Sequence, residues 1–427
     1  IVATTAIITS LWIDERAARN DADAAVEQVR THLVDAYLRQ AKLDDPVMRT
    51  ERLPWLVAAL REEEQLPAVA DAARARIGRA LAASAECRGL LAHDEAISSV
   101  AACSDGHRLV TAGLGGVAKV WRLDRPNHPE HTLHHESAVV RVSISRDGDL
   151  VATACQDGDV FLWRVTESGP SRHHLVADRA IRDMLLTHDG QWLAAIDFEG
   201  ASLLWDVQSR VPEAHHVDCP GQVVALGYVV ADGVLILGSR DGAIHRWSLP
   251  DEAFLPDRIA PTDRLRAMVV DTSGERLFAA GGDHGRLSLI ELTASPDRQR
   301  RPLASDALVT RLHWSPGRAA GIAVTEAGLA HVLGTAPAPP VRATIDVGGA
   351  VLAADLDPLG HRLAVARSDL RTEIWSVDAG GTLESVLLDR ERASIVQFLT
   401  PTTLLTVNGD LARLWKLPES ATPAALA

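Results

Sequence analysis

The chain has 427 residues, of which 47% are hydrophobic and 23% are charged, and its formal net charge is −14. That length predicts several hydrophobic cores or one large architecture built by repetition, and the apolar content excludes an intrinsically disordered chain. The acidic balance argues against a nucleic-acid-binding protein, whose footprint is a basic patch or stripe. Tryptophan is unusually frequent, with ten residues against two tyrosines and five phenylalanines, so its placement along the chain is informative.

The first segment, residues 1–13, is uncharged and is followed at once by Asp14, Glu15 and Arg16. Thirteen residues are too few to span a membrane alone, because a spanning helix needs roughly 20, and no signal-peptide pattern is present. We therefore expect residues 1–13 to be the end of a transmembrane helix whose first turns lie upstream, with Trp12 at the membrane interface. A buried strand or core helix is the alternative.

Residues 14–86 are predicted to form an α-helical linker region. No glycine or proline occurs between residues 14 and 43, and apolar side chains recur there at steps of three and four along one face: Val26, Val29, Leu33 and Tyr37. Asp45 and Pro46 end this helix and offer the start of the next. Two more helices are expected over about 47–63 and 67–86.

A period of about 42 residues runs through the rest of the chain. It is marked by a tryptophan or a large aliphatic residue at eight positions: Trp121, Trp163, Trp205, Trp247, Ile290, Leu333, Trp375 and Trp415. A fixed period sustained in this way is the signature of a repeat architecture. Each period holds two glycine-containing turns between short runs of β-favouring residues, as in DGDVFLW, which predicts two hairpins and therefore four strands per repeat.

Four short strands per repeat, with tryptophan closing the third, resemble the WD40-repeat β-propeller family over about residues 87–417. The likeness is strong in repeats one, two and four, although only Trp205-Asp206 keeps the WD dipeptide. A histidine that precedes the first strand in that family is present as His93 and His135. The resemblance implies a mainly β fold, with an eight-bladed propeller at residues 87–418 and a flexible tail at 419–427. Seven blades are the alternative, if the copy around Leu333 is an insertion.

The resemblance also implies a structural tetrad of His, Ser or Thr, Asp and Trp that ties the strands of one blade together by hydrogen bonds. Only repeat two can complete it, with His135, Thr153, Asp157 and Trp163, whereas repeat one has Gly115 where the aspartate belongs. We expect a structural role, because a satisfied polar network mainly holds one conformation. The family closes its ring with an N-terminal strand, and residues 87–91 are placed to pair with the blade that ends at Trp415.

No motif of an enzyme or of a metal centre is present. The sequence lacks a GxxxxGK[ST] phosphate loop, a GxSxG elbow and an HExxH helix, and its four cysteines form no CxxC pair. The adjacent histidines at 173–174 and 215–216 point to opposite faces of a strand, so neither pair can chelate one ion from one surface. We therefore expect no catalytic residue, no cofactor and no metal, and no enzyme within this chain.

Partners of the resembling family commonly meet the residues just before the second turn of a repeat and at the start of its first strand. Mixed charges with one exposed aromatic side chain suit a protein or peptide surface. The partner-binding candidates at these positions are Arg141, Gln156, Asp183, Phe198, Arg240 and Arg311.

The order of segments resembles that of large bacterial multidomain regulators, either signal-transduction NTPases or Ser/Thr kinases that carry WD repeats. This likeness implies a non-enzymatic protein–protein interaction or sensor module of a larger membrane-attached bacterial signalling protein, with a missing upstream NTPase or kinase domain and a cytoplasmic propeller. It implies a protein partner on the propeller face, membrane contact through the N-terminal helix, and no nucleic acid. Two alternatives stay open: a propeller enzyme or small-ligand binder that uses the central channel, and a passive structural scaffold.

Overall fold

The computed structural model describes residues 85–418, with gaps at 167, 178, 188, 210–211, 256–263, 272, 283–284, 293–299, 304–306, 315–319, 379 and 389–391. The predicted transmembrane segment at 1–13 and the tail at 419–427 lie outside the described residues, as does the predicted helical region up to residue 84. In the part of the chain that is described, no helix has the length and apolar character that crossing a membrane requires.

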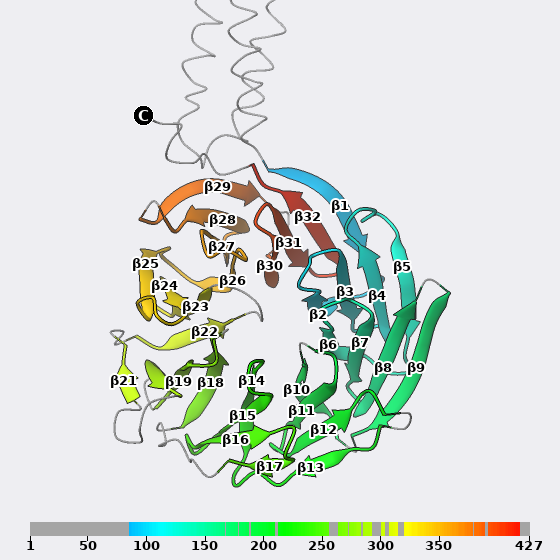
Figure 1. Ribbon diagram of the computed structural model, residues 1–427. Helices are drawn as coiled ribbons and strands as arrows, with labels where there is room; N and C mark the ends of the chain where they lie inside the picture. Colours follow the sequence, from blue (N-terminus) through cyan, green and yellow to red (C-terminus); the bar gives the residue numbers. More distant parts are fainter. Residues whose placement is uncertain are drawn as a thin grey trace, which may run out of the picture. The chain divides into compact units, whose positions relative to one another are not determined.

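The described residues form 32 strands in eight antiparallel sheets of four strands each, arranged as the blades of a ring (Figure 1). The first strand of each blade is innermost and the fourth is outermost. The expected eight-bladed propeller is therefore confirmed, and the seven-bladed alternative is wrong. The weak repeat around Leu333 is a complete blade rather than an insertion.

Blades 1 to 4 follow one another along the chain with the same strand order. Blade 1 consists of β2 (Ile97–Ala102), β3 (Arg108–Gly113), β4 (Val117–Arg122) and β5 (Pro129–His134). Blade 2 consists of β6 (Val139–Ile144), β7 (Leu150–Cys155), β8 (Asp159–Thr166) and β9 (Gly169–Val176). Blade 3 consists of β10 (Ile181–Leu186), β11 (Trp192–Asp197), β12 (Ser202–Asp206) and β13 (His215–Val217). Blade 4 consists of β14 (Val223–Val229), β15 (Val234–Ser239), β16 (Ile244–Ser248) and β17 (Ala253–Phe254).

Blades 5 to 8 complete the ring. Blade 5 consists of β18 (Leu265–Val270), β19 (Arg276–Gly281), β20 (Arg286–Glu291) and β21 (Arg300–Pro302). Blade 6 consists of β22 (Val309–His313), β23 (Ala320–Thr325), β24 (Leu329–Gly334) and β25 (Val341–Asp346). Blade 7 consists of β26 (Val351–Leu356), β27 (Arg362–Arg367), β28 (Arg371–Ser376) and β29 (Thr382–Leu388). Blade 8 consists of β30 (Ile395–Thr400), β31 (Thr403–Asn408), β32 (Leu411–Lys416) and, as its outer strand, β1 (Glu86–Ala92).

The core lies between the blades, because each sheet packs a face against each of its two neighbours. The second strands β3, β7, β15 and β23 are buried at every position. Apart from Arg108 at the start of β3, their side chains are apolar or small on both faces, as expected for strands covered on two sides. The repeated tryptophans keep one register against these strands, with Trp121 opposite Leu109 and Trp205 opposite Leu193. The 42-residue spacing therefore reflects one buried position repeated around the ring.

Blade 6 lacks the third-strand tryptophan and fills its place in another way. Leu333 lies opposite Gly321, and a Cβ atom on Gly321 would come within 2.2 Å of the Trp314 ring. Trp314 is only 8% exposed and stacks on Phe278 of blade 5, with ring centroids 5.8 Å apart. A tryptophan outside the 42-residue period thus packs over the glycine, which explains how this weak repeat retains a full blade.

The ring is closed by the first described strand. β1 pairs antiparallel with β32, and Cys87 lies opposite Trp415, so the closing strand predicted at 87–91 is confirmed. Leu91 is completely buried in a cluster that joins blades 8 and 1 and includes Leu109 and Leu414. Because β1 pairs with a strand that lies more than 300 residues later in the sequence, closure of the ring depends on this long-range pairing.

Candidate functional site

One face of the ring collects the ends of the second strands and the starts of the first strands, because successive strands run antiparallel. Backbone hydrogen bonds join the two at equivalent places, from the N–H groups of Leu114, Gln156 and Arg240 to the carbonyls of Ala96, Ala138 and Gln222 respectively, over 2.9, 2.8 and 2.7 Å. We call this side of the propeller, marked by the turns at 114–116, 156–158, 198–200 and 240–242, the entry face.

All six predicted partner-binding residues lie on the entry face and are exposed. Three of them directly follow second strands: Gln156, Phe198 and Arg240. The other three are the third residues of first strands: Arg141, Asp183 and Arg311. The candidates are therefore distributed over blades 2, 3, 4 and 6, and partner contact at each of them stays a prediction.

A β-bulge explains how charged residues are presented on inner strands. In seven of the blades the pairing of the first and second strands slips after the first residue, as between Val139 and Arg141 or between Val309 and Arg311. A bulge bends the strand and redirects its side chains. Val139 and Val142 are accordingly buried while Arg141 between them is exposed.

Arg141 and Asp183 belong to adjacent blades and interact electrostatically. Partial desolvation raises the pKa of the Asp183 carboxyl, while a hydrogen bond from the Met184 N–H and the positive charges of Arg141 and Arg182 act in the opposite direction. Asp183 is exposed to solvent but surrounded by protein at the inner rim. The structure therefore brings together at least one pair of the predicted residues.

Two exposed leucines of the entry face were missed by the sequence reasoning. Leu114 is 46% exposed and holds in blade 1 the position that Phe198, 65% exposed, holds in blade 3. The repeat itself contained the signal, since positions 114, 156, 198 and 240 are each 42 residues apart. Leu370, in the equivalent turn of blade 7, is 40% exposed. Exposed large apolar side chains on several turns of one face are typical of an interaction surface.

Leu370 is also conformationally strained. At this place in the turn, six other blades have a glycine with positive φ: Gly116, Gly158, Gly200, Gly242, Gly285 and Gly328. Leu370 adopts the same left-handed region with φ of 71°, which costs a side chain with a Cβ roughly 1–2 kcal/mol. The chain therefore retains an unfavourable, solvent-exposed leucine where glycine fits best.

A cavity of about 370 Å³ opens on the entry face between blades 3 and 4, and its lining includes Glu199 and Gly200 of the turn that also contains Phe198. Its walls include Glu199, which pairs with Arg179, and the loop residues Asp218 and Gln222. The buried Ser202 hydroxyl, which lines the cavity, has no hydrogen-bond partner. The cavity is polar and could receive a hydrogen-bonding side chain of a partner.

Three of the four residues of the predicted tetrad in blade 2, Trp163, Thr153 and His135, are joined by hydrogen bonds. The indole N–H of Trp163 donates to Thr153 Oγ1 over 3.0 Å, and Thr153 Oγ1 lies 2.8 Å from His135 Nε2. His135 Nδ1 lies 3.3 Å from the Gly116 carbonyl, so the network assigns the proton to Nδ1 and makes Nε2 the acceptor of the Thr153 hydroxyl. Asp157 accepts a hydrogen bond from the Asp159 N–H within its own turn, and none joins it to His135.

Blade 1 contains the same three-residue chain. Trp121 Nε1 donates to Thr111 Oγ1 over 2.8 Å, and Thr111 Oγ1 lies 2.6 Å from His93 Nε2. The glycine at 115 therefore removes nothing essential, because the aspartate does not take part in blade 2 either. The shared hydrogen-bonding unit of these two repeats is His–Thr–Trp.

These two histidines predict sensitivity of the fold to acid. Burial lowers the pKa of His93 and of His135 to about 4, below the ordinary 6.5. The unfolded chain therefore binds more protons between pH 6.5 and pH 4, so the stability that the neutral rings contribute is present above pH 6.5 and is lost as pH falls through this window. After allowance for solvent screening we expect a loss of about 2 kcal/mol per histidine.

The measurement is the melting temperature between pH 7.5 and pH 4, for the wild type and for the double variant His93→Gln/His135→Gln. The variant should start lower at pH 7.5 and change less between pH 6.5 and pH 4. An identical pH slope in the two proteins would contradict the assignment of this acid sensitivity to the two histidines.

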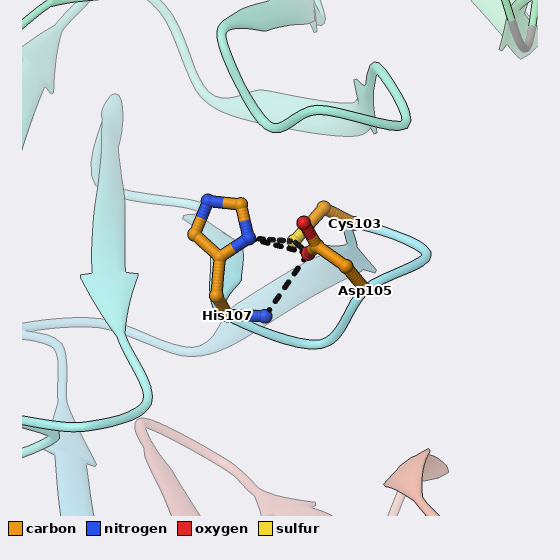
Figure 2. Close-up of side chains that lie close together, drawn as sticks. All are labelled: Cys103, Asp105 and His107. Atoms are coloured by element: carbon orange, nitrogen blue, oxygen red, sulfur yellow. Dashed lines mark hydrogen bonds and ion pairs between the residues drawn. The ribbon is translucent and has the colours of Figure 1, made fainter.

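Cys103, Asp105 and His107 form a compact group of possible metal ligands on the opposite face, in the turn after β2 (Figure 2). The turn repeats in the next blades with a hydroxyl in place of the thiol, since Ser145 and Thr187 each bond to the aspartate two residues later. Desolvation and the Asp105 hydrogen bond raise the pKa of Cys103 to about 11. The group is therefore a turn motif in which a neutral thiol replaces a hydroxyl.

The comparisons with known proteins agree with this architecture. Residues 85–122 and 127–164 match the family described as "WD domain, G-beta repeat", and no curated protein matches the chain. Among solved structures, Saccharomyces cerevisiae Sqt1 is 14% identical with a TM-score of 0.62, covering 79% of this chain and all of that one. The β-propeller domain of Myceliophteria thermophila Cps50 (Swd1) is 13% identical with a TM-score of 0.53, covering 78% of this chain and 99% of that one. At such identities the likeness shows the fold alone.

Proposed function

We propose that this eight-bladed β-propeller, two of whose repeats match the family described as "WD domain, G-beta repeat", is a non-enzymatic interaction module that binds a protein partner on its entry face. WD40 propellers are typically protein-interaction scaffolds and generally non-catalytic. The observation that carries the proposal is the combination of exposed Leu114, Phe198 and Leu370 with neighbouring charged residues on one face. Apolar anchors within a charged surround are the arrangement found at protein–protein interfaces.

The strain at Leu370 supports the same face. A residue that costs stability and exposes apolar surface is retained when another role requires it. A partner that covers Leu370 would return the free energy of desolvating this side chain. The Ser202 hydroxyl in the cavity between blades 3 and 4 adds a polar group that a partner can satisfy.

The test is quantitative affinity capture from a lysate of the source organism, with the full chain as bait. Phe198→Ala and Leu370→Gly should each weaken the captured complex by about tenfold or more, because interface anchors contribute most of the binding energy. Leu370→Gly should at the same time raise the melting temperature, because it relieves the backbone strain.

Leu359 and Val230 provide matched controls. They are 53% and 49% exposed and lie in turns between first and second strands, on the opposite face. Leu359→Ala and Val230→Ala should leave capture unchanged. If these variants lose the partner and Phe198→Ala retains it, the binding face has been assigned to the wrong side.

The wider setting is a separate proposal that rests on the sequence before the propeller. The uncharged residues 1–13 and the helix-favouring residues that follow them support a membrane-attached bacterial signalling protein, with the propeller on the cytoplasmic side. In that setting the partner bound by the propeller would be a component of the signalling pathway. Fractionation of the natural protein tests this: recovery in the membrane pellet after a high-salt wash is expected, and complete release by salt would contradict it.

A further inference from the structure

Arginines gather at the inner rim of the entry face. They lie at the starts of first strands in blades 2, 3, 5 and 6, and we call them the arginine rim: Arg141, Arg182, Arg264, Arg266 and Arg311. A backbone hydrogen bond locates Arg264 on the entry face. Its carbonyl accepts the Gly282 N–H over 3.1 Å, as the carbonyls of Ala96 and Ala138 accept the equivalent N–H groups in blades 1 and 2. The inner strands that carry the arginine rim surround the centre of the ring (Figure 1).

The guanidinium groups of the arginine rim are little used by the fold: Arg182 is half-buried and the other four are exposed, and the Arg141 guanidinium donates one hydrogen bond, to the Val140 carbonyl over 2.9 Å. Within the described residues no ion pair involves any of the five, although the Asp183 carboxylate interacts electrostatically with Arg141 and Arg182. Two arginines of the opposite face are instead buried in ion pairs. Arg108 is 8% exposed and pairs with Glu130 and Asp149, and Arg362 is 5% exposed and pairs with Glu384.

From this contrast we infer that the arginine rim binds an acidic peptide segment of the protein partner, with the carboxylates of the peptide paired to the guanidinium groups. The inference rests on the proposed function and names the chemistry of the partner. Arginine presents a planar fork that matches a carboxylate in two parallel hydrogen bonds. Five such groups around one rim, in a chain of net charge −14, make a local positive field in acidic surroundings.

The same surroundings favour a short peptide over a nucleic acid. Exposed carboxylates lie outside the arginine rim on the entry face, among them Asp94, Glu95, Glu136, Asp241 and Asp410. A long polyanion crossing the face would meet these negative charges, whereas a short acidic segment can end at the rim. Lysine, which contributes to sequence-independent phosphate binding, occurs only at positions 42, 119 and 416.

The experiment measures fluorescence anisotropy of a labelled peptide of eight glutamates titrated with the full chain, at 50 mM and 300 mM salt. A peptide of eight glutamines and a dT20 oligonucleotide serve as the uncharged and nucleic-acid probes. Two double variants remove the charges while retaining side-chain size: Arg141→Gln/Arg182→Gln and Arg266→Gln/Arg311→Gln. Arg164→Gln is the matched control. Arg164 is exposed and pairs with Leu150 at the start of β7, which places it on the face of the propeller opposite the entry face.

We expect the glutamate peptide to bind about tenfold more tightly than the glutamine peptide, and to weaken at the higher salt. Each double variant should lose about tenfold in affinity while Arg164→Gln binds as the wild type does. Equal affinity for the two peptides, unchanged binding by both double variants, or an equal loss in Arg164→Gln would overturn the inference. Tighter binding of dT20 through the same arginines would overturn it in favour of a nucleic acid.

The failure of this inference is distinguishable from the failure of the proposed function. If both arginine double variants capture the partner normally while Phe198→Ala loses it, the entry face binds a partner but the arginine rim does not bind its acidic segment. If no variant of the entry face affects capture, the proposed function itself is wrong.

Discussion

Replacing Thr153 with valine should lower the free energy of unfolding by about 3 kcal/mol, although the two side chains have nearly the same shape. Thr153 is completely buried, and its hydroxyl is the common partner of His135 Nε2 and Trp163 Nε1. Valine removes that hydroxyl and leaves two buried polar atoms without a partner, at a cost of about 1–3 kcal/mol each. Urea unfolding followed by tryptophan fluorescence measures the change.

Thr132→Val is the matched control for this prediction. Thr132 is exposed on the outer strand β5, and a change there should stay within about 0.5 kcal/mol of the wild type. Equal stability of Thr153→Val and the wild type would mean that the His–Thr–Trp chain does not hold blade 2 together.

Replacing Leu91 with glutamate should prevent closure of the ring and cost more than about 4 kcal/mol. Leu91 is fully buried in an apolar cluster between blades 8 and 1, so the substitution places a carboxylate among apolar side chains. Its neighbour Leu90 is 51% exposed because successive residues of a strand point to opposite faces. Leu90→Glu should therefore be tolerated within about 0.5 kcal/mol.

Unfolding and size-exclusion chromatography distinguish the two variants. Leu91→Glu is expected to elute as expanded or aggregated protein, because loss of β1 leaves the edge of β32 unpaired. A compact, monomeric Leu91→Glu protein with wild-type stability would contradict closure of the ring by β1.

The number of blades could be predicted from the sequence because the period depends on one buried position. Trp121 and Trp205 are almost completely buried and occur in the same register, so each repeat must keep a large apolar residue there. The same logic located the closing strand, since an unpaired run of β-favouring residues precedes the first repeat and the last repeat lacks an outer strand.

Blade 6 shows where the period fails as a guide. The compensation joins Gly321 in β23 to Trp314, which lies just after the end of β22, and no regular spacing within the repeat relates them. A residue-by-residue comparison of repeats therefore reads this blade as degenerate, although its packing is complete.

The tetrad could be predicted only in part, because hydrogen bonding depends on orientation as well as residue type. Asp157 stands at the expected position, yet its carboxylate accepts the Asp159 N–H. Blade 3 makes the same point, since Trp205-Asp206 keeps the WD dipeptide while the Trp205 indole N–H has no hydrogen-bond partner. The residue at the threonine position there is Ala195, which offers no hydroxyl.

The entry face illustrates both the success and the limit of reasoning from repeats. Counting along the period placed Phe198 and Arg240 on one face, but it did not single out Leu114, because an apolar turn residue looks unremarkable until its exposure is known. Leu370 could not be recognised at all, since its left-handed backbone conformation leaves no mark in the sequence. The cavity between blades 3 and 4 depends on loop conformations that differ from one repeat to the next.

Hydrogen–deuterium exchange of the full chain, with and without its captured partner, tests the central claim most directly. The claim is that the partner binds the entry face of the propeller. The account predicts slower exchange in the turns at 114–116, 156–158, 198–200 and 240–242, with no change in the opposite turns at 104–107, 146–149 and 230–233. Protection of the opposite turns, with the entry face unaffected, would contradict it.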